Sequence, residues 1–220
     1  MGAPLLPHAL GGLVIEGMDR VMITRMVGVE HTGLYSVGLQ VGMLVLFVTS
    51  SFNMAWVPWL FARLKVADDA EKRRIVGVTY AYGAAILGLA ALLAVSAPVF
   101  FRLFVGRDFS GGAEYVRWIG LGYAFNGMYM MAVNYIFYVE KTYLVAVVTA
   151  LSALVNAVAT YALIRTNGAV GAAQGFMLAH LASFVLAWFF SARAYPMPWF
   201  QARGLLQGVR GLFRGRDKAS

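Results

Sequence analysis

Residues 75–101 read IVGVTYAYGAAILGLAALLAVSAPVFF, a stretch of 27 residues without Asp, Glu, Lys or Arg. A helix rises about 1.5 Å per residue, so about 20 apolar residues cross a hydrocarbon layer of about 30 Å. The stretch therefore predicts one tilted membrane-spanning helix, and it is too short for two. Much of the chain is organised in the same way, because further uncharged runs cover residues 32–62, 118–139, 142–164 and 166–192.

A sixth apolar segment, residues 4–27, precedes these runs and carries four charged side chains. Its two prolines, Pro4 and Pro7, suit the start of a helix. The runs are too long for the roughly 10-residue alternating strands of an outer-membrane barrel. We therefore expect an all-α, polytopic membrane protein with about six spans, approximately residues 4–27, 32–58, 75–98, 115–138, 142–164 and 168–192.

The composition supports the same class of protein. Of the 220 residues, 60% are hydrophobic and 13% are charged, and the mean hydropathy is +0.70. A soluble domain carries about 25% charged residues, so this chain has about half the charge needed to cover a surface that faces water. These figures exclude a soluble enzyme and a disordered chain. The absence of Cys excludes disulfide scaffolds and thiolate metal sites.

The basic residues indicate an orientation. Twelve of the 18 Lys and Arg residues fall in segment 63–74, at Lys141 and after residue 192, whereas four fall in the opposite connections. The positive-inside rule then predicts that both termini are cytoplasmic. We interpret the net charge of +8 as topology and attraction to membrane lipid, not as binding to nucleic acid. Residues 196–220 form a basic tail, in which helical spacing of apolar residues predicts an amphipathic helix on the inner leaflet; a frayed tail is the alternative.

Ionisable groups in the first apolar segment are the most informative residues, because a charge in mid-bilayer costs at least about 2.5–3.5 kcal/mol. If the helix runs from 4 to 27, Glu16 lies at its centre, Asp19 and Arg20 lie within one turn, and Arg25 lies about 14 Å away at the interface. Helical spacing predicts that Glu16, Asp19 and Arg20 share a face directed into a protein interior or a wet cavity.

These charges have two interpretations. In the first, the face lines a transport pathway, where Arg20 attracts an anionic head group and an acid, Asp19 or Glu16, takes up a proton or a cation. In the second, the charges neutralise one another and only lock helix packing. Arg25 is interpreted mainly as a residue that extends its charge to the interface.

Uncharged polar residues on the later spans support a hydrated interior. Each can form one interhelical hydrogen bond, and packing is the default interpretation for any single one. Asn126 and Asn134 share a segment with several tyrosines, which is typical of a wall that tolerates sugars. His180 has no partner at a suitable spacing and is interpreted as structural. The polar set is Gln40, Asn53, Asn126, Asn134, Asn156, Gln174 and His180.

Two further patterns predict local structure. Gly171 and Gly175 are four residues apart, which lets a neighbouring helix approach closely. Asp68 and Asp69 precede the third span, where N-capping accounts for them. No phosphate loop, zinc-binding His-Glu spacing or nucleophile elbow occurs, and three His residues are too scattered for a metal site. We therefore expect no enzyme activity, no metal and no cofactor.

Four stretches, in order, resemble one family. They are Asp19-Arg20 through Gly33-Leu34-Tyr35-Ser36, then Phe52-Asn53-Met54-Ala55-Trp56-Val57-Pro58, then Phe104-Val105-Gly106-Arg107-Asp108-Phe109 with Ala113, and finally Asn156 with Asn167-Gly168-Ala169-Val170-Gly171-Ala172-Ala173. Together they resemble the second half of bacterial polysaccharide flippases, the O-antigen and exopolysaccharide lipid-carrier exporters of the multidrug/oligosaccharidyl-lipid/polysaccharide superfamily.

The resemblance implies a fold and a function. Members of the family have about twelve or more helices in two lobes around a cavity, and cationic residues hold a pyrophosphate-linked glycan. It implies that this chain is one MATE-like lobe in the bacterial inner membrane and that Arg20 and Arg25 are the cavity charges. We expect polar positions such as Asn53 and Asn126 to tolerate the glycan. The expected substrate is an undecaprenyl-pyrophosphate-linked oligosaccharide for cell-surface polysaccharide. A second six-helix lobe is the expected partner, because one lobe alone would leave its charges against lipid.

Two other functions remain open. A cation-coupled multidrug exporter of the same superfamily would depend on carboxylates more than on arginines. A non-transporting subunit that scaffolds a glycan-assembly complex would tolerate substitution of either.

Overall fold

A computed structural model describes residues 17–199, and every regular element in this part of the chain is a helix. Residues 17–26 form the first described helix, and Gly28, with φ of 135°, turns the chain into α2, Val29–Leu64. The other elements are α3, Asp69–Phe100; a π turn, Phe101–Val105; a 3-10 turn, Arg107–Gly112; α4, Ala113–Tyr138; α5, Tyr143–Asn167; and α6, Ala169–Ala194. Gly168, with φ of 60°, is the single residue between α5 and α6.

Four of these helices are long and apolar enough to cross a membrane: Val29–Leu64, α3 with its π turn as Asp69–Val105, Tyr143–Asn167 and Ala169–Ala194. The described structure is therefore that of an all-helical, polytopic membrane protein. Two of the six expected spans are not among the four. Segment 4–27 lies largely outside the described residues, and α4 falls short in hydropathy because of its asparagines and tyrosines.

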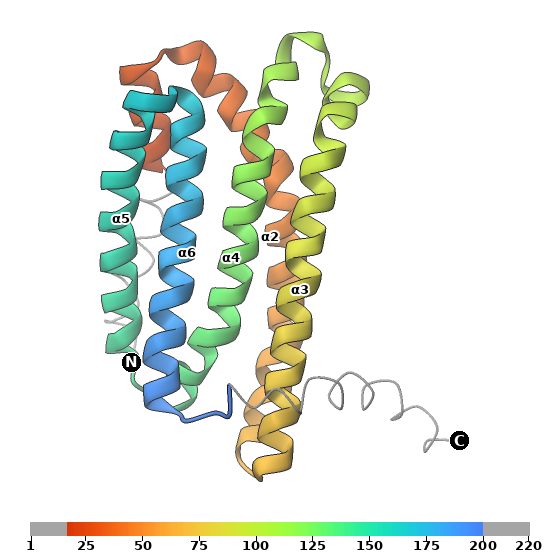
Figure 1. The fold of residues 1–220 in the computed structure, drawn as a ribbon, viewed down its shortest axis with the longest axis vertical. Helices are drawn as coiled ribbons and strands as arrows, with labels where there is room; N and C mark the ends of the chain where they lie inside the picture. Colours follow the sequence, from red (N-terminus) through yellow and green to blue (C-terminus); the bar gives the residue numbers. More distant parts are fainter. Residues whose placement is uncertain (1–16, 200–220) are drawn as a thin grey trace.

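The position of α4 explains why it can be more polar. Figure 1 shows α4 (green) between α6 (blue) and α3 (yellow), with α2 (orange) behind them. It packs on all three, and 15 of its 26 residues are buried. Small residues bring the neighbours close: a Cβ on Gly42 of α2 would meet Ile119, and one on Gly122 would meet Phe176 of α6. The asparagines of α4 therefore lie next to protein on most sides.

α5 joins the bundle through α6. A Cβ on Gly171 would collide with the backbone at Leu163, and one on Gly175 would lie 2.7 Å from Thr160 Cα. Real Cβ atoms do not approach other atoms so closely, so both positions exclude a side chain. The close helix approach expected for Gly171 and Gly175 is confirmed.

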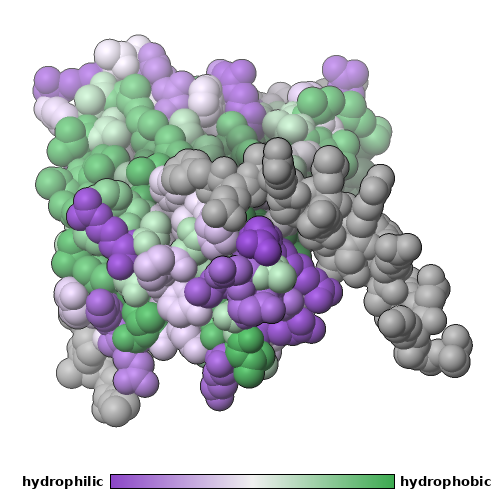
Figure 2. Space-filling view, turned by 60° about the horizontal axis from the view of Figure 1, so that its bottom comes forward, coloured by the Kyte–Doolittle hydropathy of each residue, from purple (hydrophilic) through white to green (hydrophobic). Residues whose placement is uncertain are grey.

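The helices alternate in direction, which collects the basic segments at one end. The α2–α3 turn, the α4–α5 turn and the end of α6 lie together at the lower end of Figure 1, and Figure 2 shows hydrophilic residues gathered there beside apolar flanks. Asp68 caps α3 by accepting a hydrogen bond from the Glu71 backbone nitrogen at 2.8 Å, which confirms its expected role. Arg63 and Glu71 pair across this turn at 2.6 Å. The side of the membrane that this end faces stays a prediction, and the tail expected at 196–220 falls outside the described residues beyond 199.

Candidate functional site

Asp19 is the centre of the most unusual polar cluster in the described structure. Its side chain is 0% exposed. Tyr35 of α2 donates its hydroxyl hydrogen bond to Asp19 Oδ2 at 3.1 Å. Asn156 Nδ2 and Thr160 Oγ1, both on α5, lie 3.2 Å and 3.3 Å from Asp19 Oδ1. One carboxyl group thus ties the 17–26 helix to two others.

The residues that contact Asp19 place it deep along a candidate span. Asn156 and Thr160 lie eleven and seven residues before the last residue of α5. At 1.5 Å per residue, the contact lies roughly 10–17 Å from the helix end, which is close to half the thickness of a hydrocarbon layer. The depth of the Asp19 carboxyl group is therefore inferred from its contacts with α5, and this inference does not depend on where the first helix begins.

The sequence of α5 explains how it forms this wall. Asn156 and Thr160 are four residues apart and so point to the same side of the helix. Thr160 Oγ1 also lies 3.2 Å from Asn156 Oδ1, while its backbone lies against Gly175 of α6. The glycine pair on α6 thus sets the position of α5, and α5 positions the two polar groups at Asp19.

Asp19 forms no ion pair among residues 17–199. The ion pairs of this part of the chain involve Arg63, Arg74 and Arg117, not Asp19. Removing a carboxylate from water costs free energy unless a positive charge pairs with it. A buried Asp19 is therefore stable either as a carboxylate with a bound cation or as a protonated, neutral carboxyl group. Its partners are neutral hydroxyl and amide groups that donate hydrogen bonds to the carboxyl oxygens, and a hydroxyl can also accept one from the protonated form.

The structure does not bring the expected charges together. Arg20 is exposed although Asp19, its neighbour, is fully buried, because successive residues of a helix point about 100° apart. The expected common face of Asp19 and Arg20 is therefore split between an interior cluster and an exterior surface. Arg25 is exposed as well. Glu16 lies outside the described residues.

The two expected asparagines lie in separate places. Asn53 of α2 is half-buried and accepts a hydrogen bond from Asn134 Nδ2 of α4 at 2.8 Å. Asn126 Nδ2 lies 3.4 Å from His180 Nδ1 on α6. The sequence spacing indicated no partner for His180, but the structure gives it one, Asn126, 54 residues away. Both contacts join two helices, and neither includes a residue that bonds to Asp19.

Sequence reasoning missed the partners of Asp19. Asn156 was counted among the polar residues and, like Tyr35, stands in a stretch that carries the family resemblance, but neither was given a role, and Thr160 was not singled out. The spacing of Asn156 and Thr160 was a usable signal, because together with Thr149 and Ser152 they form one buried polar stripe along α5. Within residues 17–199, no group of three His, Cys, Asp or Glu side chains could hold a metal ion.

The comparisons with known proteins agree with a membrane protein. The chain is 27% identical over 162 residues to an uncharacterized membrane protein of Haemophilus influenzae, covering 71% of this chain and 39% of that protein. It is 24% identical over 170 residues to "Lsg locus putative protein 1" of Haemophilus influenzae, covering 76% and 41%. The chain therefore spans about two fifths of the length of each. No family model matches it, and no solved structure matches it. The apolar helices and these likenesses together identify a multi-pass membrane protein.

Proposed function

We propose that this chain is a six-helix, MATE-like lobe of a bacterial inner-membrane flippase that moves undecaprenyl-pyrophosphate-linked oligosaccharide units outward for cell-surface polysaccharide. The proposal is carried by one observation. A carboxyl group without a charged partner among the described residues is buried at Asp19, while the adjacent guanidinium of Arg20 is exposed on the outside of the lobe. The family resemblance supplies the class of substrate.

In this proposal Arg20 binds the negatively charged group of the substrate. It is one residue from a side chain that lies beside the middle of α5, so its own depth is similar. An exposed guanidinium at such depth costs at least about 2.5–3.5 kcal/mol in lipid, and it is stable only beside water, an anion or another protein. A second lobe facing this surface would enclose a wet path, in which Arg20 binds the pyrophosphate of the lipid carrier.

In this proposal Asp19 couples the binding of an ion to transport. Among the described residues, it holds helix 17–26 against α2 and α5 through hydrogen bonds with neutral groups. Binding or losing a proton or small cation at Asp19 changes the strength of these bonds, and with it the packing of the helix that carries Arg20. Transport in which two lobes alternate their opening needs such a link between an ion and helix packing.

The test of the substrate role is Arg20→Ala in the full-length protein, expressed in a strain that lacks the gene. We expect surface polysaccharide to be lost while the protein remains inserted at its normal level, and Arg20→Lys to retain part of it. The matched control is Arg165→Ala, which removes an exposed arginine at the end of α5, stacked on Tyr161. Normal polysaccharide in the Arg20→Ala strain would contradict the assignment.

The Asp19 cluster also favours a second candidate, a cation-coupled multidrug exporter. Three oxygens lie close together there, from Asp19, Asn156 and Thr160, and such hard ligands suit a small cation. This function predicts that Asp19→Asn reduces dye efflux more than Arg20→Ala does. If both variants keep full activity in both assays, the scaffold function expected as a third possibility is favoured.

A further inference from the structure

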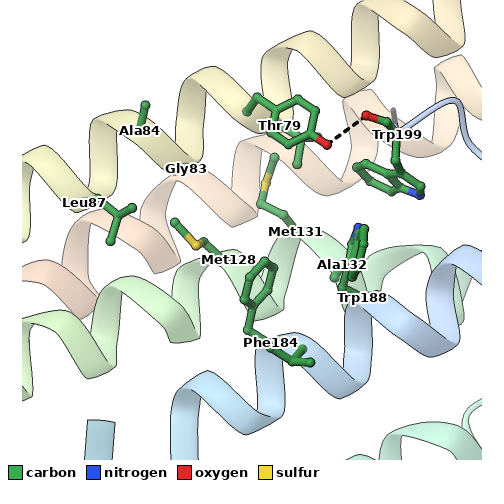
Figure 3. Close-up of a pocket in the computed structure, with 12 residues that line it drawn as sticks. Thr79, Gly83, Ala84, Leu87, Met128, Met131, Ala132, Phe184, Trp188 and Trp199 are labelled. Carbon is green, nitrogen blue, oxygen red and sulfur yellow. Dashed lines mark hydrogen bonds between the residues drawn. The ribbon is translucent and has the colours of Figure 1, made fainter. Parts of the chain in front are cut away.

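An apolar cavity of about 560 Å³ is lined by residues of α3, α4 and α6. Figure 3 shows its lining: Leu87 on α3, Met128 and Met131 on α4, and Phe184 and Trp188 on α6, with Trp199 at one end. Among the described lining residues, the hydroxyl groups belong to Thr79 and Tyr80, near that end. No residue of α2 or α5 lines the cavity, so it lies on a different side of the lobe from the Asp19 cluster.

The cavity opens to the outside of the bundle. Ala84 of α3 and Val185 of α6, both lining residues, are exposed, Val185 by 49%. Both helices are candidate membrane spans, so the opening lies at the depth of the hydrocarbon layer. Water in this cavity would find almost no hydrogen-bond partners, which leaves an apolar chain as the fitting occupant.

One end of the cavity borders a charged site. Tyr80 donates a hydrogen bond to the Trp199 carbonyl at 2.9 Å, which closes the cavity there. Beyond it, Lys72 and Arg73 of α3 line a second hollow of about 260 Å³, together with Asp69 and residues 196–198. Lys72 and Arg73 precede Thr79 and Tyr80 by seven residues, which places them on the same face of α3 about 10 Å nearer its beginning.

The charges of this hollow are available to a ligand. Among residues 17–199, the ion pairs of the α2–α3 turn join Glu71 to Arg63 and Arg74, and none involves Lys72 or Arg73. Lys72 Nζ lies 5.7 Å from the ring of Tyr195. Among the described residues that line the hollow, Lys72, Arg73 and Asp69 leave one net positive charge at the end of an apolar cavity.

We propose that an anionic phosphoglycerolipid binds here, with one acyl chain in the cavity and its phosphate head group on Lys72 and Arg73. The acyl chain by itself gives little preference for the cavity over the bilayer, because it moves from one apolar environment to another. The head group therefore decides selectivity, and one net charge near the membrane surface enriches an anionic over a zwitterionic lipid about fivefold.

The chain's own tail is the less suitable occupant. Residues 200–220 carry Arg203, Arg210, Arg214, Arg216 and Lys218 against one acid, Asp217. Its positive charge would be repelled by Lys72 and Arg73, whereas a phosphate is attracted. A second copy of the chain would bring the same basic turn to the same place.

Tryptophan fluorescence tests the proposal, because Trp188 and Trp199 line the cavity. The full-length protein is placed in phosphatidylcholine nanodiscs that contain a small fraction of phosphatidylglycerol or phosphatidylcholine with brominated chains, which quench nearby tryptophans. We expect brominated phosphatidylglycerol to give the same quenching as brominated phosphatidylcholine at about one fifth of the mole fraction. The double variant Trp188→Phe with Trp199→Phe should lose this difference.

Two variants separate the parts of the site. The double variant Lys72→Gln with Arg73→Gln should bind both lipids equally. Ala84→Phe should fill the cavity and reduce quenching by both, whereas Ala150→Phe, on an exposed position of α5, should change neither and controls for added bulk. Equal quenching by the two lipids in the unmodified protein would overturn the proposal, as would a preference that survives in the Lys72/Arg73 variant. Quenching by neither lipid would overturn it in favour of the tail or a second copy.

Discussion

Adding one methyl group at Gly175 tests how the close packing of α5 and α6 supports the Asp19 cluster. In the present structure a Cβ there would lie 2.7 Å from Thr160 Cα and 2.8 Å from Thr160 N. Both are backbone atoms, so a side-chain rotation cannot relieve the collision. Restoring an ordinary contact of 3.4 Å requires α5 and α6 to separate by about 0.7 Å at this point.

The magnitude follows from two opposing effects. Overpacking of this kind costs about 1–3 kcal/mol, and contact with two backbone atoms places Gly175→Ala at the upper end. Alanine in place of glycine stabilises a helix by about 1 kcal/mol, which offsets part of the cost. The net loss of stability is about 2 kcal/mol, or about 4–8 °C in Tm for a chain of this length. Movement of Thr160 would also lengthen its 3.3 Å contact with Asp19.

Thermal unfolding of the purified protein in detergent measures this effect. The matched control is Gly88→Ala on α3, where a Cβ meets nothing within 4 Å, so that the same gain in helix propensity acts alone. We expect Gly88→Ala to be as stable as the unmodified protein or slightly more stable. If Gly175→Ala unfolds at the same temperature as Gly88→Ala, the reasoning that α6 holds α5 in place at Thr160 is refuted.

Two smaller effects are accessible to the same measurement. Asp68→Ala removes the cap of α3, whose acceptor lies 2.8 Å from the Glu71 nitrogen, and should cost about 1 kcal/mol, whereas Asp68→Ser should retain most of it; equal losses in both variants would count against capping. Asn134→Ala removes the donor to Asn53 and should cost about 0.6–1.7 kcal/mol, and adding Asn53→Ala should cost little more, since the bond is already lost. Independent, additive losses would mean that the two asparagines act separately.

Local features of this protein were predictable from the residues near them in the chain. Long uncharged runs place the helices, because a segment that crosses lipid must be apolar and must bond its own backbone. The cap at Asp68 and the close approach at Gly171 and Gly175 were also accessible, since each depends on a few neighbouring residues. The spacing of the charges did not predict their surroundings, because Asp19 is buried and Arg20 is exposed.

Only the tertiary structure decided what each helix face meets. Asp19 bonds to Asn156 and Thr160 across 137 and 141 residues, and Asn126 meets His180 across 54. Periodicity tells which side chains share a face, but not which other helix covers that face or at what height. Helix packing brings these groups together, and it also places the polar helix α4 in the middle of the bundle. Burial of Asp19 beside an exposed Arg20 is thus a property of the assembled bundle.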